Sequence, residues 1–215
     1  MRRVGLTVLW LGMQACGGQD ATVTFQEDPV EPVQQPPPEA GNDEGTAPDW
    51  NNCPTGYLGT YYNLPLDHPD MEPEFFEEPD FDPSLHDWWD EQYQAYEEFE
   101  GSLEKGTNWW PVDDGLTDDP RYFSAVFNAW IRVNDDQPVR LSLGASSDVW
   151  VLVDGRVVAT HHTDEDFEVE VQSLDLGAGQ YPLEVRFAHR YGDSALRLRF
   201  VSENAVVCFA EYDDG

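Results

Sequence analysis

Asp148 and Trp150 are the residues whose types and spacing suit ligand binding best. They lie in the stretch SSDVWVLVDGRVVATHH (Ser146–His162), which has the pattern of two strands joined by a tight turn. Side chains alternate between the two faces of a strand, so residues two apart share a face. A carboxylate and a ring at the start of one strand could therefore contact one ligand. The alternatives are structural: Asp148 could cap the strand as a turn residue, and Trp150 could be a core aromatic.

A second candidate surface is the acidic, aromatic block at Asp80–Glu104. Flat rings beside carboxylates suit sugar recognition, but a helix packed on a sheet has the same composition. We favour packing, because the apolar stripe of a helix usually faces a core. Apolar residues from Leu85 to Leu103 recur at spacings of three or four, which predicts a helical insert over about 84–105 with Ser84 as its N-cap. The aromatic residues of the block are Trp88, Trp89, Tyr93, Tyr96 and Phe99.

Composition limits the partners and the chemistry of the chain. Its 215 residues, 40% of them hydrophobic, allow one domain with a core, plus tails. The formal net charge of −32 repels nucleic acid and attracts cations, so we expect no nucleic-acid partner. The sequence shows no Ser–His–Asp signature, no metal-ligand cluster of histidines and no phosphate-binding loop, so we predict no catalytic residue and no cofactor. A glycoside-processing enzyme is a minor alternative, because paired carboxylates can hydrolyse glycosidic bonds at defined separations.

The N-terminus has the features of an export signal. MRR supplies a positive end, and the apolar run VGLTVLWLGM that follows is too short to span a bilayer. The sequence then continues MQACGG, which resembles a bacterial lipoprotein signal with Cys16 as the lipidated residue. The alternative is an ordinary secretory signal that happens to contain a cysteine, and either signal exports the protein. We therefore predict a signal peptide over 1–15. Residues 16–52 are rich in proline and acids, which predicts a lipid anchor and a disordered tether.

From Cys53 onward the sequence predicts short strands. GYLGTYYNL (Gly56–Leu64) is one strand, and seven more candidates follow from Tyr122, separated by turn-forming residues. Asp154-Gly155 suits a two-residue type I′ hairpin. Short strands at this spacing predict an all-β fold, an antiparallel β-sandwich over 53–209, with an acidic tail at 210–215. The seven candidates are YFSAVFNAWIRV, QPVRLSLGA, VWVLV, RVVATHH, FEVEVQSLDL, QYPLEVRFAHR and ALRLRFV.

Cys53 and Cys208 flank the predicted domain. If Cys16 takes lipid, these two remain as an even pair in an oxidising compartment. We predict a disulfide that ties the first and last strands together; the alternative is two buried thiols.

Several stretches resemble the fibro-slime domain and the related protective-antigen-type β-sandwich. GYLGTYYNL and YFSAVFNAWIRV are similar to early strands of the protective-antigen module, and SSDVWVLVDGRVV is similar to the fibro-slime signature. GAGQYPLEVRFAHRYGDSALRLRF is similar to the ending that both share. DHPDME, at Asp67–Glu72, resembles a phrase near the start of fibro-slime domains. The resemblance spans Gly56–Val201.

The resemblance implies a non-catalytic surface module. Some relatives bind sugars through a calcium ion held by two adjacent aspartates, and that pair corresponds to Ser147-Asp148, where only Asp148 matches. A hard cation needs several oxygen ligands, so we expect calcium binding at Asp148 to be weak, in about the millimolar range. Ser147, Asp148 and Trp150 are thus the predicted ligand-binding residues.

We therefore expect an exported adhesion or binding module for carbohydrate or another cell-surface component. It would be held at the bacterial outer membrane or cell surface through its lipid anchor alone. The alternative is a structural envelope or interaction protein with no small ligand.

Overall fold

The computed structural model describes residues 48–65, 68–71, 83–112, 123–162, 167–189 and 193–209. The predicted signal peptide, the lipidation site Cys16, most of the tether and the acidic tail lie outside these ranges, and those predictions stay predictions. The described helices have three residues each, and none is long or apolar enough to cross a membrane.

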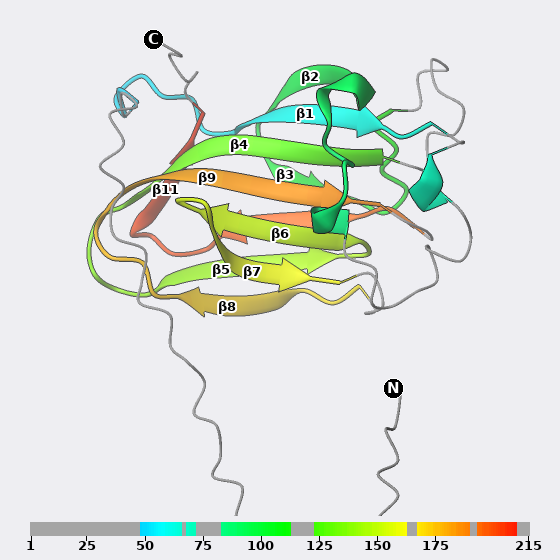
Figure 1. Ribbon diagram of the computed structural model, residues 1–215. Coiled ribbons are helices and arrows are strands. Elements are labelled where there is room, and N and C mark those ends of the chain that lie inside the picture. The colour runs from blue at the N-terminus through cyan, green and yellow to red at the C-terminus, as the bar shows by residue number, and fades with distance from the viewer. Residues whose placement is uncertain are drawn as a thin grey trace, which may run out of the picture. The chain divides into compact units, whose positions relative to one another are not determined.

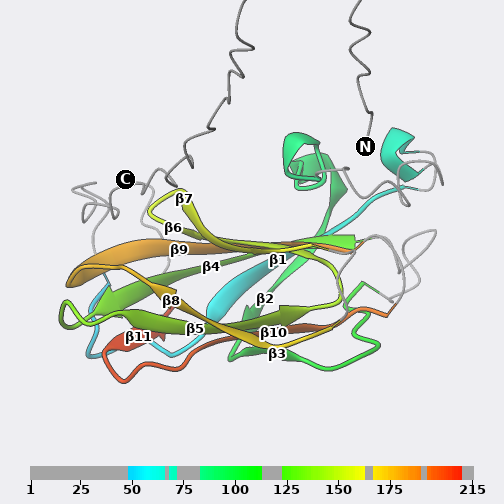
Figure 2. The same ribbon diagram turned by 90° about the horizontal axis from the view of Figure 1, so that it is seen from below.

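The strands form two antiparallel sheets packed face to face, as predicted (Figures 1 and 2). The larger sheet has the order β2-β1-β4-β9-β6-β7, with β11 also paired to β4, and the smaller has the order β3-β10-β5-β8. All eight strand predictions are confirmed. The strands are β1 (Tyr57–Asn63), β2 (Gln94–Glu100), β3 (Leu103–Lys105), β4 (Phe123–Val133), β5 (Val139–Ala145), β6 (Asp148–Val153), β7 (Arg156–His161), β8 (Glu170–Leu174), β9 (Gly179–Ala188), β10 (Leu196–Phe200) and β11 (Ala205–Cys208).

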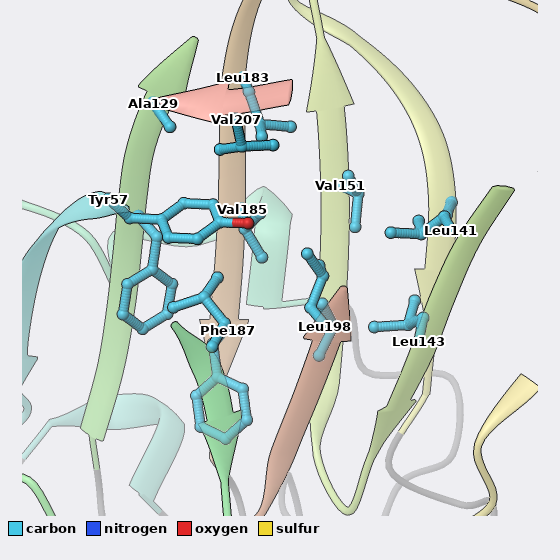
Figure 3. Close-up of a cluster of buried hydrophobic side chains, with 14 of the residues drawn as sticks. Tyr57, Ala129, Leu141, Leu143, Val151, Leu183, Val185, Phe187, Leu198 and Val207 are labelled. Carbon is cyan, nitrogen blue, oxygen red and sulfur yellow. The ribbon is translucent and has the colours of Figure 1, made fainter. Parts of the chain in front are cut away.

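The main core lies between the two sheets because each strand turns alternate apolar residues inward (Figure 3). In β6, for example, Val149, Val151 and Val153 are all fully buried. The neighbouring strand β9 contributes Val185 and Phe187 to the same core. From the opposite sheet, β5 contributes Leu141 and Leu143. The alternation visible in the sequence therefore specifies which face of each strand is buried.

The hairpin between β6 and β7 has the predicted turn. Asp154 and Gly155 both have positive φ, at 53° and 69°. A type I′ turn needs positive φ at both central residues, and Asp and Gly tolerate it better than other residues. This turn fixes the end of the hairpin opposite to Asp148.

The predicted disulfide between Cys53 and Cys208 is present, with the two Cα atoms 5.6 Å apart. β4 explains how residues 155 apart in sequence meet. One edge of β4 pairs first with β1 and then, further along, with β11. Cys208 ends β11 opposite Trp130, and Cys53 lies just before β1, so both cysteines reach the same stretch of that edge.

The end of the predicted tether, residues 48–52, contacts the sandwich. Trp50 Nε1 donates a hydrogen bond to Gln180 Oε1 at 2.9 Å, and the Arg132 guanidinium lies 4.8 Å from the Trp50 ring centroid. The chain therefore joins the domain a few residues before Cys53.

The predicted helix over 84–105 is wrong. The segment instead forms the 3₁₀ helices η2 (Pro83–Leu85) and η3 (Glu91–Tyr93), followed by β2 and β3. β2 pairs with β1, and Tyr96 stacks on Tyr61 with the ring centroids 4.7 Å apart. Pairing and stacking with a remote strand override the helical spacing, which several large aromatic residues produced by coincidence.

Residues 83–93 cover the outer face of the larger sheet (Figure 2). A second, smaller cluster of buried side chains forms there, on the face of the sheet away from the main core. Trp88 is its fully buried centre, and Trp89 and Tyr93 pack at its edge. The predicted packing role of the aromatic block is confirmed for these residues. The buried members of the cluster are Leu64, Trp88, Trp150 and Ala188.

Candidate ligand-binding edge

Asp148 lies at the end of the sandwich where β6 begins and β9 ends. The register of the larger sheet places Asp148 opposite Ala188, and Ser124 of β4 pairs with Ala188 from the other side. β7 ends nearby, with His161 opposite Val149. The beginnings of β4 and β6 and the ends of β7 and β9 therefore meet at this edge of the larger sheet.

Asp148 and Trp150 lie on the same, outer face of the sheet, as strand alternation predicts. Both are buried, with 1% of Asp148 and 6% of Trp150 exposed. Trp150 meets Trp89 edge to face, with ring centroids 5.9 Å apart. Its contacts support the packing alternative, because the ring is covered rather than open to a ligand. Asp148 is no more exposed than Trp150, and of the two side chains only its carboxylate could coordinate a cation.

The partly exposed His162 side chain approaches Asp148. Its Nδ1 lies 3.7 Å from Asp148 Oδ1, and its ring meets Trp150 edge to face at 6.4 Å. His161, the preceding residue, is buried, so the two adjacent histidines point to different surroundings. His162 thus stands between the buried carboxylate and the surface.

Ser147 is fully buried, and its hydroxyl has no hydrogen-bond partner among the described residues. A buried polar group without a partner costs about 1–3 kcal/mol. A cation or an ordered water beside Ser147 would offset that cost. Ser147 precedes Asp148 directly in sequence, and its unsatisfied hydroxyl is compatible with the cation that the family resemblance implies. The two side chains supply only part of the six to eight oxygens that calcium prefers.

A separate hollow of about 390 Å³ opens between β1, β3, β10 and β11. Its size is at the lower end of the range for small-molecule sites. Tyr57 lies in its wall, and burial raises the pKa of the Tyr57 hydroxyl above its usual value. The wall is mostly apolar, and Glu104 and Arg199 supply charged groups. No residue predicted from the sequence to bind a ligand lines this hollow.

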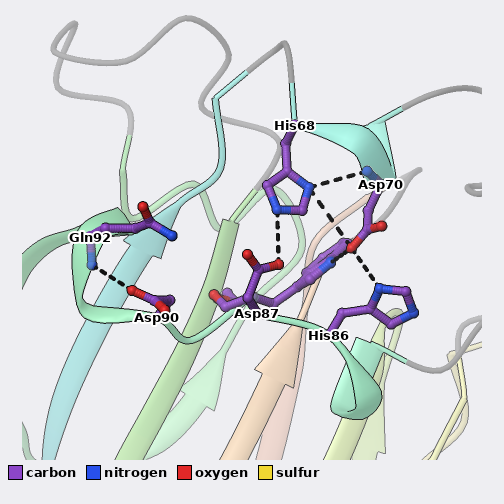
Figure 4. Close-up of polar contacts among 8 residues, drawn as sticks. His68, Asp70, His86, Asp87, Asp90 and Gln92 are labelled. Atoms are coloured by element: carbon purple, nitrogen blue, oxygen red, sulfur yellow. Dashed lines mark hydrogen bonds and ion pairs between the residues drawn. The ribbon is translucent and has the colours of Figure 1, made fainter.

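A cluster of histidines and aspartates forms where residues 68–70 meet residues 86–88 (Figure 4). His68 Nε2 lies 3.0 Å from Asp87 Oδ1, and His86 Nδ1 lies 2.9 Å from Asp70 Oδ2. The cluster was not predicted from the sequence, because the two histidines are separated by a stretch without recognisable ligand spacing. The short pairs HPD and HD are its only sequence signal.

No protein-family model and no curated protein matches the chain. Solved structures do share its fold. The A domain of epithelial adhesin 9 from Candida glabrata, in complex with Galb1-3GlcNAc, superposes with a TM-score of 0.54 at 12% identity, covering 83% of this chain and 99% of that domain. A complex of that domain with Galb1-4GlcNAc gives a TM-score of 0.51 at 11% identity, covering 82% of this chain and 99% of that domain.

A subtype-switched A domain, epithelial adhesin 9 to 1 from Candida glabrata in complex with beta-lactose, gives a TM-score of 0.50 at 14% identity. The alignment covers 78% of this chain and 88% of that domain. These neighbours are adhesin domains solved with bound sugars. At such low identity the likeness shows the fold, a two-sheet β-sandwich.

Proposed function

We propose that this chain is an exported, non-catalytic module that binds carbohydrate at the end of the sandwich around Asp148. The observation that carries the proposal is that two consecutive residues at this edge are a buried hydroxyl without a hydrogen-bond partner among the described residues, Ser147, and a buried carboxylate, Asp148. Both lie where strand ends converge. Two further lines support it: the resemblance of the hairpin to the fibro-slime signature, and the shared fold with adhesin domains that bind sugars.

The chemistry we propose is calcium-assisted. A calcium ion beside Asp148 would neutralise the buried carboxylate and engage the Ser147 hydroxyl. Vicinal hydroxyl groups of a sugar could then complete the oxygen shell in place of water. Because Ser147 supplies no charge, we expect the ion to bind weakly. Trp150 would contribute indirectly, because its contacts with Trp89 and His162 would hold the start of β6 in place.

The location we propose is the outer membrane or cell surface of a bacterium, with Cys16 carrying the lipid anchor. The disulfide between Cys53 and Cys208 supports export, because such bridges persist in oxidising compartments. The export-signal pattern of residues 1–15 and the proline-rich, acidic composition of residues 16–52 support export independently.

The proposal is tested by titrating the mature protein with glycans, with and without calcium, and by recording melting temperature against calcium. Ser147→Asp restores the pair of carboxylates, so it should tighten calcium binding and increase the calcium-dependent rise in melting temperature. Asp148→Asn should abolish that rise. Asp154→Asn is the matched control, since Asp154 lies in the turn just after the opposite end of β6. If neither wild type nor Ser147→Asp responds to calcium or to any glycan, this edge is only the end of a hairpin.

A further inference from the structure

We propose that the outer face of the smaller sheet docks an acidic segment of a partner protein that also carries apolar side chains. The face combines arginines of β10 and β5 with exposed apolar residues at β8. It lies on the opposite side of the sandwich from η1 (Pro69–Met71) and residues 83–93, which lie on the outer side of the larger sheet (Figure 2). The inference is independent of the proposed sugar site, because Asp148 belongs to the larger sheet.

The register of β10 and β5 turns three arginines outward. Arg197 and Arg199 alternate along β10 with buried leucines, so they share the outer face about 6–7 Å apart along the strand. Arg199 is opposite Ser142 of β5. The Val201 N–H donates to the Arg140 carbonyl at 2.8 Å, so Arg140 lies diagonally across from Arg199 on the same face. All three arginine side chains are exposed.

The arginines lack ionic partners among the described residues, although the chain has 43 acids and only 11 bases. None of the three guanidinium groups forms an ion pair with a described carboxylate, whereas Arg186 of the larger sheet pairs with Glu184. Glu104 of β3 is the acid that the strand register places on this face, opposite Arg197. Three arginines therefore outnumber one acid here, and the face would attract carboxylates although the whole chain has a net charge of −32.

The part of this face at β8 is apolar. Val171 of β8 is opposite Ser142, so its side chain also points outward. Val169 lies over Gly144 of β5, since a Cβ atom added to that glycine would be 2.9 Å from Val169 Cγ2. The two valines are 50% and 41% exposed, so they remain open to a partner.

Phe167 and Val201 extend the apolar surface around the arginines. The Phe167 ring lies 5.6 Å from the Arg197 guanidinium, and Val201 follows the last residue of β10. Seven large apolar side chains are exposed in the described part of the chain, and four of them gather on this face. Exposed apolar residues scattered singly are ordinary, whereas a contiguous group marks an interaction site. The four are Phe167, Val169, Val171 and Val201.

The layout of the face specifies the partner segment. β10 and β8 are two strand spacings apart, about 10 Å, with β5 between them. A docked segment would therefore place carboxylates over the arginines of β10 and apolar side chains over the valines at β8. Arginine binds a carboxylate through two parallel hydrogen bonds, and it is enriched in protein interfaces, whose centres are apolar.

A polypeptide fits this surface better than the other anionic partners. Valine offers no flat ring on which a sugar could stack. An anionic bilayer would extend beyond the face and meet the many acids of the rest of the domain. Charges more than about 8–10 Å apart are screened at ordinary salt, so a short acidic segment would respond mainly to the local arginines.

The experiment is a selection from a displayed random-peptide library on the mature protein. We expect the enriched peptides to contain both acidic and apolar residues. Their binding, measured by fluorescence anisotropy, should weaken as salt is raised. Arg199→Gln should weaken it about three- to tenfold, and Arg197→Glu/Arg199→Glu should abolish it. Val171→Ser should also weaken it. These side chains are exposed, so the melting temperatures should stay close to wild type.

Matched controls come from the larger sheet. Arg156→Gln and Val157→Ser change exposed residues at the start of β7, and Val157 is 51% exposed, as Val171 is 50%. Both variants should bind the peptides as wild type does. Asp148→Asn should also leave peptide binding unchanged, so failure of this proposal is distinguishable from failure of the sugar-site proposal.

Several outcomes would overturn the proposal. They are the absence of enriched peptides, enrichment of peptides without acidic residues, and equal binding of the peptides to wild type and Arg197→Glu/Arg199→Glu. Binding of polygalacturonate or of phosphatidylglycerol vesicles in place of peptides would assign the face to a different occupant. Sedimentation that shows self-association through these arginines would assign it to a second copy of the chain.

Discussion

The indole ring of Trp89 stands edge-on against that of Trp150, with ring centroids 5.9 Å apart and an angle of 89° between the planes. Trp89 belongs to the acidic aromatic segment, and Trp150 to the strand that begins at Asp148. Trp89 is fixed further, since its Nε1 donates to the Ala125 carbonyl and Arg186 lies over its ring. The segment whose composition also suited a separate sugar-binding surface thus packs on the predicted ligand strand.

Trp150→Ala should lower the free energy of unfolding by about 3–5 kcal/mol, because it removes a large buried ring from the outer cluster. Leu85→Ala is the control on the covering segment: Leu85 is 81% exposed, so its loss should change stability by no more than about 0.5 kcal/mol. Urea denaturation measures both values. A Trp150→Ala protein as stable as Leu85→Ala would mean that the segment does not cover β6 in solution.

Gly144→Ala should destabilise the protein by about 1–3 kcal/mol. A Cβ atom at this position of β5 would lie 2.8 Å from the Glu168 carbonyl oxygen and 2.9 Å from Val169 Cγ2, so the backbone approaching β5 would have to shift. Gly101→Ala is the matched control, because a Cβ atom there meets nothing within 4 Å. Thermal melts of the two variants should therefore differ, with Gly101→Ala close to wild type. Equal melting temperatures would contradict the close approach at Gly144.

Reduction of the Cys53–Cys208 disulfide should lower the free energy of unfolding by up to about 5 kcal/mol. The bridge closes a loop across 155 residues, and the chain-entropy model assigns this value to a loop of that length. Denaturation with and without reductant measures the effect. The double variant Cys53→Ser/Cys208→Ser should show no response to reductant. Peptide mapping that recovers both thiols free from exported protein would refute the bridge.

Stability should fall as the pH rises above about 10, the ordinary pKa of tyrosine. Burial, followed by the hydrogen bond to Glu100, raises the pKa of Tyr61 in the folded protein. The unfolded chain then loses its tyrosine protons at a lower pH than the folded chain, so alkaline pH favours unfolding.

The Tyr61→Phe variant isolates this contribution to the pH dependence. It removes the ionisable group and should make the alkaline loss less steep, with a modest loss of stability at neutral pH from the missing hydrogen bond. Urea denaturation across the alkaline range measures both slopes. Identical slopes for the variant and wild type would assign the pH dependence to other groups.

Cys16→Ala should release the protein from membranes. The prediction rests on MQACGG and the tether sequence, which lie outside the described residues. Fractionation of cells that express either form gives the answer. A Cys16→Ala protein that still fractionates with membranes as wild type does would place the attachment elsewhere.

The linear sequence was sufficient to predict β1, the seven strands β4 to β10, the type I′ turn and the choice of disulfide partners, but it did not predict β11. The strands and the turn depend on short-range rules. Alternation of apolar residues along a strand indicates which face is buried, as at Val149, Val151 and Val153. An Asp-Gly pair between two strands favours a turn with positive φ at both residues, as at Asp154 and Gly155. Cys53 and Cys208 could be paired because each lies at a boundary of the strand-forming region.

Tertiary packing determined which surfaces of these elements are covered by other segments and which stay exposed. The segment with helical spacing became β2 because Tyr96 gained a partner strand and the ring of Tyr61, neither of which local spacing encodes. The covering of Trp150 and the meeting of His68 with Asp87 likewise depend on where remote segments pack. Side-chain contacts between distant residues arise only after the sheets assemble, so a linear pattern could identify Asp148 as a candidate but not the cluster of His68, Asp70 and His86.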